Sequence, residues 1–185
     1  FPEFAGEAVF LDIETTGLDP SVSAVTTISV YRGGKLNTYV ASRNMEEFYD
    51  FAQDIRLLVT YNGRCFDVPF IHRSLGIDLR NVPHIDLRYL LGGLGFRGGL
   101  KCCEIRLGVS RPEAVSRVDG LMAVLLWEEF QSTGKEEVLE TLLHYNVTDT
   151  VNLHRLMVEG YNMRLAKLRI PLAPLTVPSP PNNPY

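Results

Sequence analysis

The chain has 185 residues, 45% of them hydrophobic and 22% charged, which suits one globular domain with a substantial core. A membrane-spanning helix needs about 20 consecutive apolar residues, and no run in the chain is that long. The first residues do not resemble a signal peptide. The net charge of −4 argues at first against a nucleic-acid partner. However, residues 64–117 hold nine Lys and Arg against five Asp and Glu, so this third carries +4 and the remainder −8. A basic face beside an acidic pocket fits a polyanionic substrate, and scattered surface charge is the alternative.

Short strands and helices alternate along the chain. We expect strands at 7–13, 24–31, 35–41, 56–61 and 84–87, with a hairpin turn at 32–34. We expect helices at 44–53, 65–75, 119–134 and from 136 to beyond 157, and a glycine-rich loop at 92–99. Three strands followed by alternating helices and strands predict an α/β fold of the ribonuclease-H-like type, a mixed five-stranded sheet flanked by helices.

The end of the chain differs in composition from the rest. Six of the last fifteen residues are proline, a density that prevents a regular packed element. We therefore expect one domain over residues 1–168 and a proline-rich tail or linker over 169–185. The three cysteines, Cys65, Cys102 and Cys103, are odd in number and lack metal-ligand spacing, which indicates reduced thiols and a cytoplasmic location without a membrane partner.

Three short acidic motifs occur in order along the chain. In the first, Asp12 and Glu14 lie two residues apart at the end of an apolar strand, so both side chains face the same way. The carboxyl ends of strands are where α/β sheets hold ligands, and Thr15-Thr16-Gly17 then turns the chain. The alternative is a strand end that emerges into solvent.

The second motif is Asn62 with Asp67, where a strand leads into a helix. Asp67 either caps this helix or joins Asp12 at the same sheet edge as a ligand for a cation. In the third motif, Tyr145 and Asp149 share one helix face, because positions i and i+4 lie about 40° apart around a helix. His144, five positions before Asp149, lies about 140° away, so we favour Tyr145.

The strings LDIETTGL, YNGRCFDVPF and YNVTDTVNL together resemble the DEDD superfamily of 3′–5′ exonucleases, in its tyrosine-containing branch, over about residues 7–160. The nearest resemblance is to stand-alone exonuclease domains related to the proofreading domains of B-family DNA polymerases. The resemblance implies a ribonuclease-H-like fold and a nucleic-acid substrate. It also implies metal binding by Asp12, Glu14, Asp67 and Asp149, with Tyr145 positioning the attacking water.

The chemistry explains why such a site needs cations. Two like charges about 4 Å apart repel by about 4 kcal/mol at an effective dielectric constant of 20, so four acids need compensating charge. Oxygen ligands suit two Mg²⁺ or Mn²⁺ ions, which bind the attacking and leaving oxygens of a phosphodiester. We expect Asp12 to bridge both ions, Glu14 and Asp149 to complete the first, and Asp67 to serve the second.

Substrate contacts are expected from residues that flank the motifs. The candidates are Thr15, Thr16, Asn62, Arg64 and Lys101, with Arg97 and Arg106 as further phosphate contacts. Phe66 and Phe96 are candidates for base stacking, although core packing is favoured for Phe66. The leading prediction is a metal-dependent 3′–5′ exonuclease that acts on the 3′ end of single-stranded DNA or RNA by a two-metal-ion mechanism. The alternatives are an endonuclease of the same fold and an inactive domain that only binds nucleic acid.

Overall fold

The sheet is mixed and has five strands in the order β3-β2-β1-β4-β5. The computed structural model describes residues 1–179, 184 and 185. Its strands are β1 (Val9–Thr15), β2 (Val25–Arg32), β3 (Lys35–Val40), β4 (Leu58–Thr60) and β5 (His84–Asp86). β1 pairs antiparallel with β2 and parallel with β4, while β2–β3 is an antiparallel hairpin and β4–β5 a parallel pair. The expected mixed five-stranded sheet is therefore confirmed.

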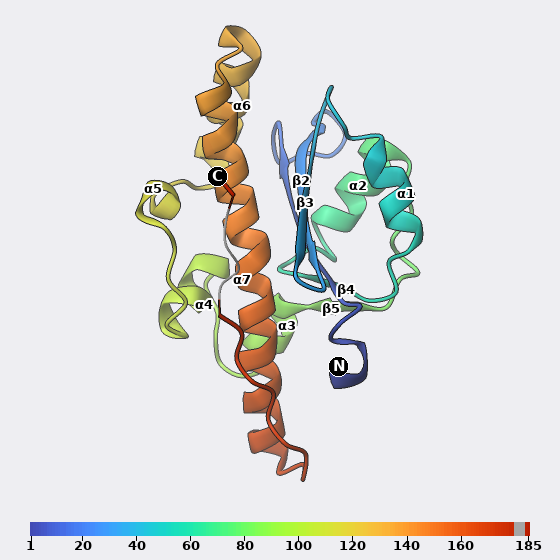
Figure 1. Cartoon of the computed structure of the whole chain (residues 1–185), viewed down its shortest axis with the longest axis vertical. Helices are drawn as coiled ribbons and strands as arrows, with labels where there is room; N and C mark the ends of the chain where they lie inside the picture. Colours follow the sequence, from blue (N-terminus) through green and yellow to red (C-terminus); the bar gives the residue numbers. More distant parts are fainter. Residues whose placement is uncertain (180–183) are drawn as a thin grey trace.

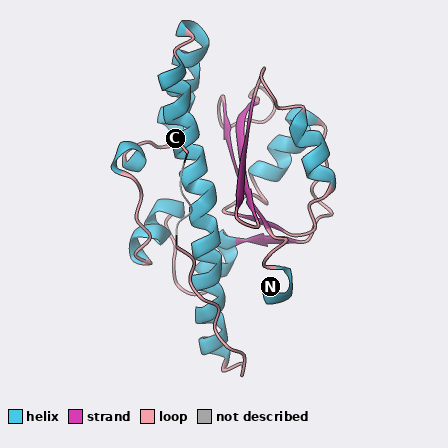
Figure 2. Ribbon diagram, viewed as in Figure 1, coloured by secondary structure: helices cyan, strands magenta, loops and turns pink. Residues whose placement is uncertain are grey.

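Helices cover both faces of this sheet (Figure 1, Figure 2). They are α1 (Glu47–Gln53), α2 (Asp67–Leu75), α3 (Leu87–Gly92), α4 (Leu100–Arg106), α5 (Glu113–Ser116), α6 (Gly120–Thr133) and α7 (Glu136–Leu168), with a 3₁₀ turn, η1, at Pro2–Phe4. α1 and α2 pack on one face through Phe48, Phe70 and Ile71. α7 covers the other face through residues such as Val147 and Leu156. Since β1 lies between these two layers, nearly all of its residues are buried, which explains its continuous apolar run.

Several element ends differ from the expected ones. The first strand starts at Val9 and continues to Thr15, and the fourth is only Leu58–Thr60. The first two helices start at Glu47 and Asp67, later than expected, because the residues before them form turns. α2 and α6 do end at glycines, Gly76 and Gly134, both in the left-handed conformation that closes a helix.

Three short helices and the η1 turn were not expected from the sequence. α3 begins directly after β5, because the Asp86 side chain accepts a hydrogen bond from the Arg88 backbone N–H and caps the first turn. Gly92 is the last residue of α3, so the glycine-rich loop is shorter than expected. α4 and α5 each bury one or two side chains, Cys103 and Glu104 in α4 and Val115 in α5.

The described part of the tail has no helix or strand and runs back along α7 (Figure 1). The Asn162 side chain bonds both the N–H and the carbonyl of Leu175, and the Tyr185 hydroxyl lies 2.9 Å from that of Thr38. Pro180 and Pro181, which contributed to the expectation of a tail, lie outside the described residues. The division at residue 168 stays a prediction, although α7 ends there.

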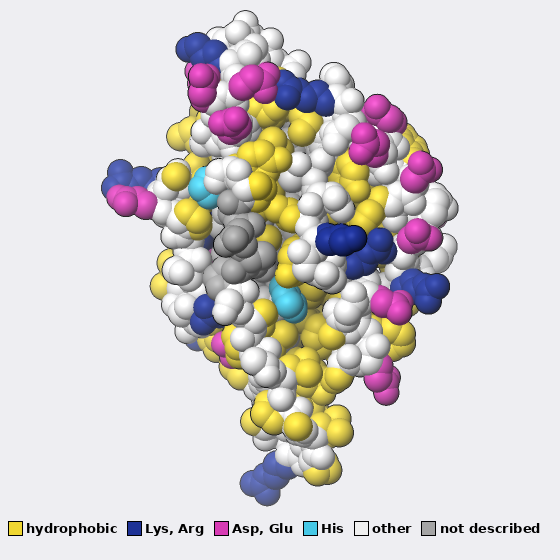
Figure 3. Space-filling model, viewed as in Figure 1, with side chains coloured by type: hydrophobic (Ala, Val, Ile, Leu, Met, Phe, Trp, Pro, Cys, Tyr) yellow, Lys and Arg dark blue, Asp and Glu magenta, His cyan; other side chains and the backbone are white. Residues whose placement is uncertain are grey.

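The surface in the same view is mixed in character (Figure 3). Acidic side chains gather over α1, where Glu46, Glu47 and Asp50 are exposed, and hydrophobic side chains gather near the C-terminal end of α7. Within the described residues, none of the helices combines the length and apolar character that a bilayer crossing requires.

Candidate metal centre

Three carboxylates from two distant parts of the chain meet at the end of β1. Asp12 and Glu14 come from β1, and Asp149 comes from the middle of α7, which packs across β1 and β2. One oxygen of each lies within 4.8 Å of the others. Glu14 is 8% exposed and Asp149 6%, so water screens these charges poorly. The alternation of β1 and the register of α7 thus create a compact cluster of oxygen atoms, the acidic cluster.

Asp67 lies beside this cluster but outside the closest group of three. It is the first residue of α2 and is 4% exposed. Its negative charge contributes to raising the pKa of both Asp12 and Glu14, so it is their electrostatic neighbour. Burial raises the pKa of Asp67 itself to about 7, while hydrogen bonds from its own backbone and that of Ile13 lower the pKa. The four acids expected from the sequence are therefore brought to one sheet edge.

Burial and mutual repulsion make these acids hard to ionise together. Burial is the largest cause that raises the pKa of Asp12 and Glu14 well above the usual range, and the charge of Asp149 is the next. Burial also raises the pKa of Asp149 to about 6, although the neighbouring Arg111 lowers it. At neutral pH the cluster therefore gains from any bound positive charge.

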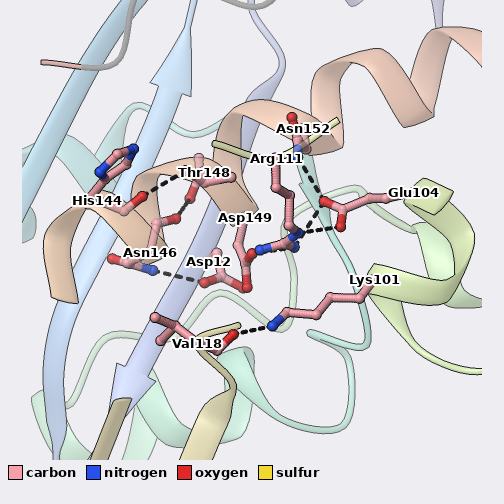
Figure 4. A network of polar contacts seen from close by, with 11 residues as sticks. Asp12, Lys101, Glu104, Arg111, Val118, His144, Asn146, Thr148, Asp149 and Asn152 are labelled. Carbon is pink, nitrogen blue, oxygen red and sulfur yellow. Dashed lines mark hydrogen bonds and ion pairs between the residues drawn. The ribbon is translucent and has the colours of Figure 1, made fainter. Parts of the chain in front are cut away.

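Tyr145 lies against the cluster on the same helix. Its side chain is hydrogen-bonded to Asp149, which lies one turn further along α7. Burial first, and then the charges of Asp149, Glu14 and Asp12, raise the Tyr145 pKa far above its usual value. The phenol therefore keeps its proton at neutral pH. His144 is only partly buried, and its ring points away from Asp12 and Asp149 (Figure 4).

Lys101 also reaches this region, from α4. Its ammonium group lies 5.3 Å from the centre of the Tyr145 ring and donates a hydrogen bond to the Val118 carbonyl oxygen. Its positive charge lowers the pKa of Glu14. Of the residues expected to contact substrate, Lys101 is thus the one whose charge acts on the acidic cluster.

The other expected contact residues shape turns at the same sheet edge. The Thr15 hydroxyl donates to the Gly17 carbonyl at 2.6 Å, and the Thr16 hydroxyl accepts from the Ala24 N–H. Asn62 adopts a positive φ of 67°, and its side-chain oxygen accepts a hydrogen bond from Arg88. The backbone N–H groups of Asn62 and Arg64 both donate to the Asp86 carboxylate. These side chains lie outside the acidic cluster, and Phe66 packs against Phe70 in the core, as favoured.

Four further polar residues support the cluster, and the sequence analysis did not predict them as part of the site (Figure 4). Asn146 donates to Asp12 at 2.8 Å and accepts from the Thr27 hydroxyl. Arg111 pairs with Asp149 at 2.5 Å and with Glu104, which also accepts from Asn152. Asn146 and Asn152 lie inside the third motif. Because they are polar residues on a helix whose neighbouring residues are buried, the sequence could have indicated that each needs a hydrogen-bond partner. Arg111 and Glu104 carry no such signal, because Asp149 and Asn152, which they contact on α7, are remote in sequence.

The donor set fits a hard divalent cation. The cluster offers only carboxylate oxygens, which suit Mg²⁺ or Mn²⁺. The three closest acids provide a single compact ligand group, and Asp67 provides a fourth carboxylate beside it. Burial, and then the charges of Asp149, Glu14 and Asp67, raise the pKa of Asp12, so a bound cation would favour the ionised form of this acid.

A groove opens next to the second motif. Its volume is about 760 Å³, and it lies between the Tyr61-Asn62 turn and the loop that joins α3 to α4. The walls combine aromatic rings, two guanidinium groups and glycine backbone: Tyr61, Tyr89, Phe96, Arg88, Arg97, Gly92, Gly93, Gly98 and Gly99. Arg106 lies over the Phe96 ring at 4.7 Å, outside the lining. Such a lining offers stacking surfaces and anion-binding donors in one place.

The sheet order, the crossing helix α7 and the acids at the end of β1 define the class of ribonuclease-H-like folds. The chain belongs to the RNase H superfamily, whose family model matches residues 9–161. No curated protein matches the chain. The fold expected from the sequence and the family comparison therefore agree.

Solved structures with the same fold include a polymerase and a nuclease. The family B DNA polymerase of the hyperthermophilic archaeon Pyrobaculum calidifontis matches at 18% identity and a TM-score of 0.65, over 86% of this chain and 24% of the polymerase. The chain thus spans about a quarter of that protein. Brucella melitensis NrnC with bound Mg²⁺ matches at 20% identity and a TM-score of 0.61, over 89% of this chain and 76% of NrnC. NrnC bound to pGG matches at 22% identity and a TM-score of 0.57, over 88% and 75%.

Proposed function

We propose that this protein is a metal-dependent nuclease that removes nucleotides from the 3′ end of nucleic acid. The observation that carries the proposal is the buried cluster of Asp12, Glu14 and Asp149, with Asp67 beside it. Buried acids at this density cost stability unless a positive charge compensates them. Stability of the fold alone does not explain why four acids gather at one sheet edge, since uncompensated buried charge destabilises the folded protein.

The positions of the acids support a separate proposed role for each. Asp12, Glu14 and Asp149 would hold one divalent cation, and Asp67 together with Asp12 a second. Two such cations, when bound, supply the charge that stabilises the attacking and leaving oxygens in phosphodiester cleavage. Asn146 fixes the Asp12 carboxylate by its hydrogen bond, so this ligand is oriented before any ion arrives.

Tyr145 would orient the attacking water. Its hydroxyl is tied to Asp149 and keeps its proton, so its oxygen can accept a hydrogen bond from a water molecule near the acids. It is a poor general base because its pKa lies far above neutrality. Lys101, above the Tyr145 ring, would add positive charge where a phosphate approaches. These positions support an assignment to the tyrosine-containing exonucleases.

The groove supports a nucleic-acid substrate with unpaired bases. Tyr89 is 55% exposed and lies with Phe96 and Tyr61 around a cavity large enough for a nucleotide. Aromatic rings that stack on bases, next to Arg88 and Arg97 for phosphates, are typical of single-strand binding. The Mg²⁺ and pGG bound to the structurally similar NrnC are consistent with this substrate class.

The test is a cleavage assay on 5′-labelled single-stranded DNA and RNA, with Mg²⁺ or Mn²⁺ titrated into EDTA-treated protein. We expect a ladder of products shortened from the 3′ end, and no products when the 3′ end is blocked. The variants Asp12→Ala and Asp149→Ala should lose measurable turnover, because each removes a proposed metal ligand, while His144→Ala should keep it.

Each other result points to a different function. Internal cleavage of the 3′-blocked strand would support an endonuclease of the same fold. Folded protein that binds the strands but leaves them intact with either metal would support an inactive binding domain. Near wild-type rates in Asp12→Ala would contradict the metal-site assignment itself.

A further inference from the structure

A buried chain of polar contacts leads away from the acidic cluster. Arg111 lies in the segment between α4 and α5, Glu104 on α4 and Asn152 on α7. The Arg111 guanidinium forks onto Glu104, with Nε at 2.5 Å from one oxygen and Nη2 at 2.9 Å from the other. Nη2 also lies 2.5 Å from Asp149 Oδ1. Asn152 donates to Glu104 at 2.8 Å, which anchors the far end of the chain (Figure 4).

The burial of this chain is unusual for charged groups. The side chain of Glu104 is 1% exposed and that of Arg111 is 8% exposed. Both charged groups are therefore shielded from water. Direct contacts among α4, the segment between α4 and α5, and α7 fix the orientation of the two side chains. Arg111 also lies 5.8 Å from the centre of the Tyr145 ring, so its plane is restricted on that side as well. A guanidinium held in this way has little freedom to move.

Two roles are possible for Arg111 beside a metal ligand: a competing positive charge, or a group that orients Asp149. The Glu104 carboxylate, in direct contact with Arg111, carries −1 and offsets part of the Arg111 charge. At Asp149, where burial is the largest cause of the raised pKa, the charge of Arg111 lowers the pKa and that of Glu104 raises it. Arg111 therefore competes with a cation less than an unpaired charge would, while its contact with one oxygen of Asp149 restricts that carboxylate.

We propose that Arg111, held by Glu104 and Asn152, is a positioning residue that fixes the Asp149 carboxylate for metal binding. The proposal rests on the proposed function, in which Asp149 is a metal ligand. The contact with Oδ1 restricts rotation of the carboxylate, one oxygen of which belongs to the acidic cluster. Groups that orient metal ligands in this way typically change metal affinity by 10- to 100-fold when they are altered.

The experiment measures Mn²⁺ binding to the EDTA-treated protein, without nucleic acid, from the electron paramagnetic resonance signal of free Mn²⁺. In Arg111→Lys the charge stays but a single ammonium cannot span Glu104 and Asp149, so we expect the Mn²⁺ dissociation constant to rise about 10-fold. In the double variant Glu104→Gln/Arg111→Gln the net charge of the site is unchanged and the fork is lost, so a similar rise is expected.

Arg43→Lys is the matched control. Arg43 also forks onto a carboxylate, that of Glu136, but on the surface, where its side chain is 43% exposed. Its Mn²⁺ affinity should stay within about twofold of wild type. Circular dichroism and melting curves establish that each variant is folded. If Arg111→Lys does not fold, the neutral double variant carries the test.

The outcomes separate the two proposals. Wild-type protein that binds no Mn²⁺ would contradict the proposed metal site. Wild-type protein that binds Mn²⁺, with folded Arg111 variants of equal or tighter affinity, would overturn only the positioning role. A second readout is rescue: the Mn²⁺ concentration for half-maximal cleavage by Arg111→Lys should rise by the same factor as its dissociation constant, with full turnover recovered at saturation.

Discussion

Asp67 is an acid that the fold keeps protonated over part of the ordinary pH range. Its pKa rises from 3.8 to about 7, mainly by burial. A carboxyl group with a raised folded-state pKa binds more protons in the folded than in the unfolded chain. Its contribution to stability is therefore present at low pH and is lost as the pH rises from about 4 to about 7.

Asp67→Asn should remove this dependence, because the amide oxygen can accept the same backbone hydrogen bonds without a charge. Relative to wild type, the metal-free variant should gain on the order of a few kcal/mol in free energy of unfolding at pH 8, and less than about 1 kcal/mol at pH 4. Chemical denaturation in EDTA at the two pH values measures this. A gain of the same size at both would show that the charge of Asp67 is not responsible.

Tyr145 gives a second prediction at this scale. In Tyr145→Phe the ring and its contacts with Lys101 and Arg111 remain, while the hydroxyl that bonds Asp149 is lost. We expect turnover to fall by about 10- to 100-fold and Mn²⁺ affinity to change little, since the acids stay in place. Single-turnover cleavage together with Mn²⁺ titration checks both. An equal loss in His144→Ala would favour the histidine instead.

Individual acids were predictable from the sequence because their spacing matches a strand or helix period. Asp12 and Glu14 share a strand face, and Tyr145 and Asp149 share a helix face. Asn146 was not recognised, since its role depends on Asp12, at the other end of the chain. Arg111 was missed for the same physical reason, because only tertiary packing brings it to Asp149.

At the scale of elements, the turn between β4 and α2 is the most tightly built part of the site. A Cβ added at Gly63 would lie 2.3 Å from the Thr60 hydroxyl oxygen. Thr60 cannot easily move, since that oxygen accepts from the Gly63 N–H and pairs with His84 at 2.9 Å. Only glycine therefore fits between the strand and the helix that carries Asp67.

Gly63→Ala should destabilise the protein by about 1–3 kcal/mol through this overlap and should weaken Mn²⁺ binding by displacing Asp67. Gly120→Ala is the control, since a Cβ there meets open space at the start of α6. Melting curves and Mn²⁺ titration measure both effects. A Gly63→Ala protein as stable as Gly120→Ala would show that the turn adapts.

Long elements were predictable and short ones were not, for a physical reason. α6 and α7 carry sustained periodicity, and α6 has an Asp119 cap and a Gly134 stop that are readable locally. α3, α4 and α5 have at most seven residues each, too short to be stable helices alone. Side chains such as Leu91, Cys103 and Val115, buried against the rest of the protein, stabilise them, and no local pattern records that packing.

At the scale of the whole molecule, the acidic cluster links metal binding to stability. A cation that binds only the folded protein stabilises it by about 2.7 kcal/mol at a concentration 100 times its dissociation constant. For a chain of this size that corresponds to a rise in Tm of roughly 5–10 °C. We expect this rise with Mg²⁺ or Mn²⁺ in wild type and a much smaller one in Asp149→Asn. Equal rises in both, seen by calorimetry, would place the ions elsewhere.

The fold as a whole was within reach of the sequence because the strand and helix order leaves few right-handed, unknotted arrangements. The path of the tail was not, since the bonds of Asn162 to Leu175 involve backbone groups that any residue carries. The groove was also missed, because its walls come from the loop before α4 and from the turn after β4, which lie far apart in sequence.

The placement of Asp149 on the last helix has a consequence for protein synthesis. Asp12, Glu14 and Asp67 leave the ribosome long before α7, which also covers one apolar face of the sheet. A nascent chain that stops short of α7 therefore lacks both a complete acidic cluster and half of its core. A ribosome must therefore translate as far as α7 before the cluster can assemble.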